Sequence, residues 1–180
     1  IGIITKKYQI IMTRHKKATV ALIYDFDGTL SPGNMQEYGF IQAAGLDANT
    51  FWEKNTKMKE AQDASEILCY MKLMISEASH KGLLLTKNSL KDYGKNVELF
   101  KGVKEWFALI NKYGSDNGIV IEHYINSSGL KEIIEGTPIA KEFKHIYACS
   151  FFYSPEGKAE WPAVAVDFTA KTQFLFMINK

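Results

Sequence analysis

The fold of this chain is decided by residues 18–30, which read ATVALIYDFDGTL. The first seven form a continuous apolar, partly β-branched run, which is typical of a strand buried on both faces of a parallel sheet. We expect this strand to stop at Asp25, with Gly28 allowing a tight turn shortly after it. Two carboxylates, Asp25 and Asp27, therefore stand directly at the end of a buried strand.

Carboxylates in this place indicate a ligand-binding site that can also hold a metal ion. In an open parallel sheet, ligands bind beyond the carboxyl ends of the strands. Asp25 and Asp27 alternate around Phe26, so both can address one pocket, where Mg²⁺ would offset their repulsion. One carboxylate can then act as a nucleophile and the other as an acid and base, while Thr29 offers a hydroxyl. Asp-Gly-Thr by itself is common turn chemistry, but the preceding strand disfavours that simpler interpretation.

Composition excludes several classes of protein. The 180 residues are 46% hydrophobic, which allows one domain with a modest insertion and a real core. Lysine and arginine number 22 against 20 acidic residues, so we expect no nucleic-acid partner. Cys69 and Cys149 show neither CxxC nor Cys/His spacing, which predicts two buried, reduced cysteines rather than a disulfide or zinc site.

The sequence contains no apolar run near the roughly 20 residues that span a bilayer, and it opens without the features of a secretory signal. We therefore expect a cytoplasmic protein that does not bind a membrane. Met12 opens a basic run before the first strand, so residues 1–11 are interpreted as an upstream extension.

Between the first strand and the next α/β pattern, residues 38–93 are helical in character. Five apolar residues recur there at helical spacing, which predicts a core stripe more readily than the wall of a ligand pocket. They are Ile67, Leu68, Met71, Met74 and Ile75. The expected organisation is a split α/β core with a Rossmann-like parallel sheet, residues 12–32 and 95–180, interrupted by a helical cap over residues 33–94.

Further elements are expected after the cap. The first is an amphipathic helix through Trp106, Phe107, Ile110 and Tyr113 that closes at Gly114. A strand over residues 118–125 and a short helix through Leu130, Ile133 and Ile134 follow it. The chain then continues with two strands within 145–166, around a turn at 154–157, and a final helix over 169–180.

Residues 25–30, DFDGTL, resemble the first motif, DxDGT, of the haloacid dehalogenase superfamily. The resemblance implies that Asp25 attacks phosphorus to form an aspartyl-phosphate, and we expect the Thr29 hydroxyl to help bind the phosphate. It implies that Asp27 protonates the leaving group and then activates the hydrolytic water, and that Asp25 and Asp27 hold Mg²⁺. A second aspartate at this place is typical of the superfamily's phosphatases and mutases.

Two further motifs resemble the phosphoserine-phosphatase branch of that superfamily. Ser127, followed by Ser128 and Gly129 at the end of a strand, is similar to its phosphate-binding second motif. Lys171 is similar to the basic third motif, which neutralises the nucleophile and the phosphoryl oxygens. Without the first motif, Ser127 would be interpreted as a helix N-cap and Lys171 as a solvated lysine. Lys131 and Lys141 have less suitable spacing.

A fourth motif, GDxxxD, completes Mg²⁺ binding in the superfamily, and the chain reaches Lys180 without it. Asp167 precedes Lys171 and does not suit that role. We therefore expect a parent protein that continues further, and weak Mg²⁺ binding with little turnover from this chain by itself. His123, inside an apolar strand, is interpreted as a satisfied core histidine.

Cap residues are expected to select the leaving group. The candidates are Glu37, Tyr38, Trp52, Lys57, Lys59 and His80. The expected function is Mg²⁺-dependent hydrolysis of a small phosphate monoester. A phosphotransferase or phosphomutase with the same nucleophile, and a non-catalytic binding module on this fold, stay open as alternatives. The particular ester and the oligomeric state are also left open.

Overall fold

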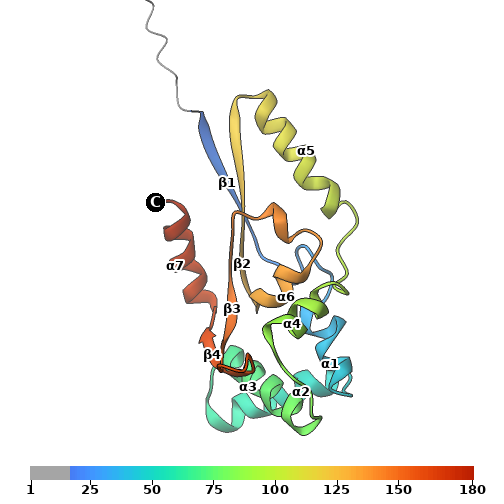
Figure 1. Ribbon diagram of the computed structural model, residues 1–180. Helices are drawn as coiled ribbons and strands as arrows, with labels where there is room; N and C mark the ends of the chain where they lie inside the picture. The colour runs from blue at the N-terminus through green and yellow to red at the C-terminus, as the bar shows by residue number, and fades with distance from the viewer. Residues whose placement is uncertain (1–16) are drawn as a thin grey trace, which may run out of the picture.

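A computed structural model describes residues 17–180 (Figure 1). The expected extension over residues 1–11, and residues 12–16 of the expected core, lie outside the described part. The strands (β), helices (α) and short 3-10 helices (η) follow in this order: β1 (Ala18–Tyr24), η1 (Met35–Tyr38), α1 (Phe40–Ala43), α2 (Ala48–Gln62), α3 (Glu66–His80), α4 (Lys87–Gly94), α5 (Val103–Asp116), β2 (Ile119–Leu130), α6 (Lys131–Gly136), η2 (Ala140–Glu142), β3 (His145–Tyr153), β4 (Ala159–Val164) and α7 (Phe168–Ile178).

The strands form one sheet in the order β1-β2-β3-β4. The first three are parallel, and β4 returns antiparallel to β3. Tyr24 pairs with Ile125, so the residues that follow them, Asp25 and Asn126, emerge at the same edge of the sheet. The expected α/β class with a largely parallel sheet is confirmed.

The expectation that β1 is buried on both faces is wrong. Among the described residues, β1 pairs with β2 on one side only and forms an edge of the sheet. Its side chains are largely exposed, including Val20 at 40% and Ile23 at 36%. A continuous apolar run indicates a strand, but burial depends on neighbours that residues 18–24 do not contain.

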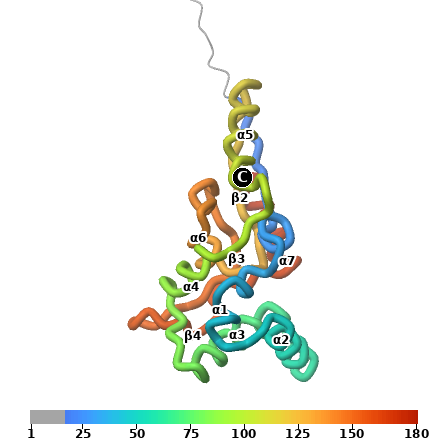
Figure 2. Tube along the Cα trace, turned by 90° about the vertical axis from the view of Figure 1, so that its right-hand side faces the viewer, coloured from blue at the N-terminus to red at the C-terminus, as the bar shows by residue number. Residues whose placement is uncertain are grey.

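Helices η1 to α4 gather beyond the carboxyl ends of β1 and β2, as Figures 1 and 2 both show. The predicted helical character of this segment is confirmed. Met71 and Met74 are fully buried, whereas Leu68, predicted to share their stripe, is 42% exposed. None of the helices between residues 17 and 180 is long and apolar enough to cross a membrane.

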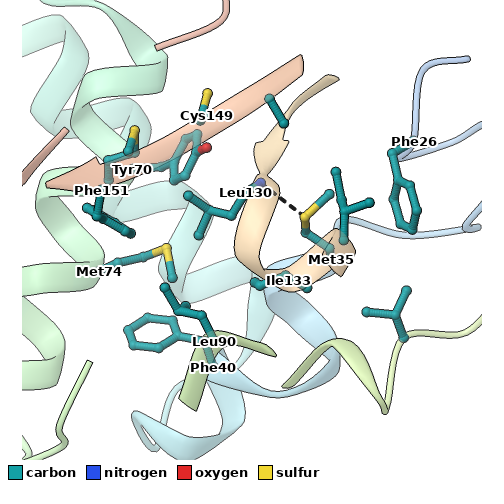
Figure 3. Packing of buried hydrophobic residues seen from close by; sticks show 14 of the residues in the cluster. Phe26, Met35, Phe40, Tyr70, Met74, Leu90, Leu130, Ile133, Cys149 and Phe151 are labelled. Atoms are coloured by element: carbon teal, nitrogen blue, oxygen red, sulfur yellow. Dashed lines mark hydrogen bonds between the residues drawn. The ribbon is translucent and has the colours of Figure 1, made fainter. Parts of the chain in front are cut away.

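One cluster of buried apolar side chains joins the helical segment to the sheet. Figure 3 shows Phe40 and Met74 from the helices in the same cluster as Leu130 at the end of β2 and Ile133 in α6. Because these side chains are excluded from water together, the helices are held against the strand ends by hydrophobic burial.

Helix α5 differs from its predicted form at both its end and its face. It continues past Gly114 to Asp116. Gly114 is buried because α5 packs closely on β2, where an added Cβ would meet Ile121 and the Ile119 carbonyl. Phe107 faces the core, but Trp106 and Tyr113 are exposed. A glycine near the end of a pattern can thus mark close packing instead of a helix cap.

Helices α4 and α6 approach each other at two glycines. A Cβ on Gly94 would meet the Ile133 carbonyl oxygen, and a Cβ on Gly136 would meet the Lys91 carbonyl oxygen. The missing side chains allow the two backbones to touch. This contact holds α4, which precedes the second strand of the α/β pattern, against α6, the helix that follows β2.

The β3–β4 hairpin has the predicted turn. Gly157 N donates to Ser154 O at 2.8 Å, and Gly157 has a positive φ of 80°. The hairpin also contacts the helical segment, because Ala159 N donates to Leu85 O at 2.8 Å.

Candidate functional site

Asp25 follows β1 and lies at the carboxyl edge of the sheet. Its Oδ1 accepts a hydrogen bond of 2.8 Å from Phe26 N, and its Oδ2 lies 2.6 Å from Lys171 Nζ. The Asp25 side chain is 43% exposed. It is therefore an accessible carboxylate with a cation held against one oxygen.

Asp27 sits in the turn after β1, which Gly28 makes possible with a φ of 73°. Asp27 Oδ1 accepts a hydrogen bond of 3.0 Å from Met35 N. Burial raises the pKa of Asp27 to about 7, the negative charge of Asp25 acts in the same direction, and the Met35 N–H opposes them. Near neutral pH, Asp27 can consequently both give and take a proton.

Ser127 is 1% exposed and precedes a turn at the end of β2, where the pairing with β3 becomes irregular. Its Oγ accepts from Gly129 N at 3.0 Å, which leaves the hydroxyl proton for another acceptor. Tyr70 Oη donates to Ser128 O at 2.8 Å, and Cys149 Sγ donates to the same oxygen at 3.3 Å. Helix α3, which carries Tyr70, thus holds the backbone of this turn.

Met35 connects this turn with Asp27. Besides its N–H bond to Asp27, Met35 accepts a hydrogen bond at Sδ from Leu130 N at 3.1 Å, drawn as a dashed line in Figure 3. Gly129 leaves room for it, because a Cβ at Gly129 would force the end of the Met35 side chain to shift.

Lys171 reaches the site from the first turn of α7. Asp167 caps this helix by accepting from Ala170 N at 2.8 Å. Asn126 Nδ2 donates to Lys171 O at 2.8 Å and so holds the helix start against the end of β2. Asp167 therefore has a capping role in the structure and is not a further metal ligand of the site.

These groups line one cavity of about 260 Å³. The expected site residues in its wall are Asp25, Asp27, Ser127, Ser128, Gly129 and Lys171. Thr29, which we expected to bind phosphate, is exposed and does not line the cavity, because the turn at Gly28 directs residue 29 to solvent. The helical segment adds Gln36, Trp52, Glu66 and Tyr70 to the wall.

Of the cap residues proposed from sequence, only Trp52 lines this cavity among the described residues. Its Nε1 donates to Glu37 Oε1 at 2.8 Å. Lys57 pairs with Glu53 and Lys59 with Glu66, while His80 is exposed at the end of α3. Gln36 and Tyr70 were missed because no local motif marks a residue whose role depends on contacts made far along the chain.

Lys131 and Lys141 do not line the cavity and lie near Glu135 and Glu142. His123 is 3% exposed, and both ring nitrogens have partners, Tyr24 Oη at 2.9 Å and Asn111 Oδ1 at 3.0 Å. It is the satisfied core histidine that the sequence predicted. Cys69 and Cys149 are free and buried, also as predicted.

No protein-family model matches the chain. An uncharacterized protein of Borreliella burgdorferi is 29% identical in an alignment of 191 positions, which covers 89% of this chain and 65% of that protein. The chain therefore spans less than two thirds of this relative's length.

Solved structures share the fold. A HAD family hydrolase of Salmonella enterica serovar Typhi has a TM-score of 0.64 at 13% identity, covering 90% of this chain and 50% of that one. A substrate-bound phosphoserine phosphatase has a TM-score of 0.60 at 17% identity, covering 91% and 71%. A phosphoserine phosphohydrolase-like protein of Francisella tularensis has a TM-score of 0.51 at 22% identity, covering 89% and 74%. At these identities the likeness assigns the fold.

Proposed function

We propose that this chain, which has the fold of haloacid-dehalogenase-type phosphatases, belongs to an enzyme that hydrolyses a small phosphate monoester through an aspartyl-phosphate on Asp25. The observation that carries the proposal is the cavity itself. There an accessible carboxylate, a second carboxyl with a pKa near 7, a buried serine and one lysine meet at the carboxyl ends of two parallel strands.

In the first step, an Asp25 oxygen attacks phosphorus, and the bond between phosphorus and the ester oxygen breaks. Asp27 gives its proton to the departing oxygen, so the leaving group departs as a neutral alcohol. The pKa of Asp27, raised to about 7 by burial, keeps a useful share of this group protonated at neutral pH.

In the second step, a water oxygen attacks phosphorus while Asp27 accepts its proton. The bond between phosphorus and Asp25 breaks, which releases inorganic phosphate and restores the carboxylate. Lys171 Nζ, 2.6 Å from Asp25, offsets the negative charge that gathers when a phosphoryl group enters. The free hydroxyl proton of Ser127 is available to a phosphoryl oxygen.

The residues present suit Mg²⁺ as an additional component. Asp25 and Asp27 are hard oxygen ligands, and Mg²⁺ is commonly bound through one or two carboxylates together with substrate phosphate oxygens and waters. Burial, with a smaller contribution from the negative charge of Asp25, raises the pKa of Asp27, and a cation beside the two carboxylates would lower it. Among residues 17–180, however, no group of three His, Cys, Asp or Glu side chains gathers for a metal. When bound, Mg²⁺ would neutralise phosphoryl charge.

The test is release of inorganic phosphate from a panel of small phosphate esters by the whole enzyme that contains this chain, with and without Mg²⁺. Asp25→Asn should abolish release, because an amide is not an anionic nucleophile. Asp116→Asn is the matched control, since Asp116 is an exposed carboxylate at the end of α5. Release that survives Asp25→Asn would refute the mechanism. Transfer of the phosphoryl group to an added alcohol, in place of release as inorganic phosphate, would identify a transferase.

A further inference from the structure

Gln36 is a wall residue of the cavity that has no task in the proposed chemistry. Gln36 lies in η1, directly after Met35, and is 2% exposed. It lines the cavity, yet its Oε1 is buried without a hydrogen-bond partner among the described residues. Buried polar groups are almost always paired, so an unpaired amide oxygen on a residue that lines a ligand cavity indicates a partner that a ligand supplies once the amide turns toward it.

The rest of the wall determines which ligand groups are acceptable. Three carboxyl side chains line the cavity, Asp25, Asp27 and Glu66. Among the described lining residues Lys171 is the one cation, and Asp25 already holds it at 2.6 Å. Glu66 pairs at 3.2 Å with Lys59, which does not line the cavity. A carboxylate on a ligand would meet like charges here, whereas a hydrogen-bond donor would meet acceptors.

We infer that the leaving group of the substrate carries a hydrogen-bond donor, a hydroxyl or an ammonium, and no carboxylate, and that Gln36 is the residue that accepts from this donor. The inference rests on the proposed phosphatase function and adds the class of leaving group. The terminal torsion of a glutamine is soft, so the amide can turn its oxygen toward the ligand without moving η1. A site with a buried acceptor rejects an analogue that lacks the donor, because the acceptor stays unpaired.

Four esters matched in size test the inference: ethyl phosphate, 2-hydroxyethyl phosphate, 2-aminoethyl phosphate and phosphoglycolate. The measurement is kcat/KM for phosphate release from each, relative to ethyl phosphate. We expect the hydroxyl or the amino ester to exceed ethyl phosphate by about five- to tenfold, the effect of one hydrogen bond. Phosphoglycolate should fall below ethyl phosphate. Comparison of kcat/KM between the hydroxyl ester and the amino ester identifies which donor the site prefers.

Two substitutions assign the preference to Gln36. Gln36→Met keeps the length of the side chain but removes the acceptor, so the ratio of the donor ester to ethyl phosphate should fall to about one. Gln36→Glu keeps an acceptor oxygen, so it should retain the preference and favour the amino ester further. Because both esters react at the same centre, the ratio of their kcat/KM values does not change when a substitution affects the catalysis of both equally.

Asn55 provides a matched control. It is 1% exposed and also has a buried amide oxygen without a partner, but it lies in α2 and does not line the cavity. Asn55→Leu should leave the ratio unchanged.

Equal kcat/KM for ethyl and donor esters, preferred hydrolysis of phosphoglycolate, or a preference that survives Gln36→Met would each overturn the inference while leaving the phosphatase function intact. If Gln36→Met does not fold, Gln36→Glu and the wild-type order of the four esters decide. Absence of phosphate release from every ester by the whole enzyme that contains this chain, with Mg²⁺ present, would refute the proposed function and this inference with it.

Discussion

Lys171 Nζ lies 2.6 Å from Asp25 Oδ2, although 146 residues separate the two in the chain. The contact joins the end of the first strand to the first turn of the last helix. It is possible because Asp167 caps α7 and Asn126 holds the helix start beside β2. The candidate active site therefore depends on the whole described α/β core.

Replacing Lys171 should weaken catalysis more than folding. Lys171→Met removes the cation beside Asp25, and we expect kcat/KM for phosphate esters to fall by about a hundredfold, as with loss of one electrostatic stabiliser. Lys171→Arg should recover part of the loss. Lys112→Met, at an exposed lysine paired with Asp116, is the control and should leave kcat/KM unchanged. Equal activity of Lys171→Met and wild type would remove Lys171 from the mechanism.

Asp27 should reduce stability at alkaline pH. Its pKa is raised to about 7 in the folded protein from an ordinary value of 3.8. Below 3.8 the carboxyl is neutral in both states, and stability is lost as pH rises toward 7 because only the unfolded chain ionises freely. In metal-free buffer, Asp27→Asn should therefore raise the free energy of unfolding by about 4 kcal/mol at pH 8 and by little at pH 4.

Urea denaturation at the two pH values measures this difference. Mg²⁺ bound at Asp27 would lower its pKa, so added Mg²⁺ should narrow the gap between wild type and Asp27→Asn at pH 8. Identical stability of the two proteins at pH 8 without metal would show that Asp27 is not destabilised by burial.

Tyr70 and Tyr153 permit a paired test of the turn that carries Ser127, for which we propose phosphate binding. Both hydroxyls donate in the interior, Tyr70 to Ser128 O at 2.8 Å and Tyr153 to Glu132 Oε1 at 2.7 Å. Tyr70→Phe should raise the inhibition constant of inorganic phosphate severalfold, because the Ser128 carbonyl loses a donor that orients the turn. Tyr153→Phe should leave that constant unchanged but lower the free energy of unfolding by about 1–3 kcal/mol, since Glu132 becomes unpaired. Equal inhibition constants for the two variants would mean that Tyr70 does not position the turn.

Gly136→Ala should be strongly destabilising. The new methyl group would enter the space of the Lys91 carbonyl, so α4 and α6 would have to separate. We expect a loss of about 3 kcal/mol or more in the free energy of unfolding, measured by thermal or urea denaturation. Gly82→Ala, at a positive φ with open space around it, should cost only about 1 kcal/mol. A loss at Gly136 no greater than that at Gly82 would contradict the close contact of α4 and α6.

The amino-acid sequence by itself determined the parts of this protein that depend on local pattern. An apolar run that stops at Asp25, a second strand that leads to Ser127 and a last helix that carries Lys171 are all readable within short windows, and parallel strands place their carboxyl ends at one edge. The tertiary structure alone decided that β1 is an edge strand, that Gly114 is a packing contact, that Thr29 is outside the cavity, and that Gln36 and Tyr70 are in its wall. The physical reason is that periodicity and turn chemistry act between neighbours in the chain, whereas burial and hydrogen-bond pairing are set by residues brought together from distant segments.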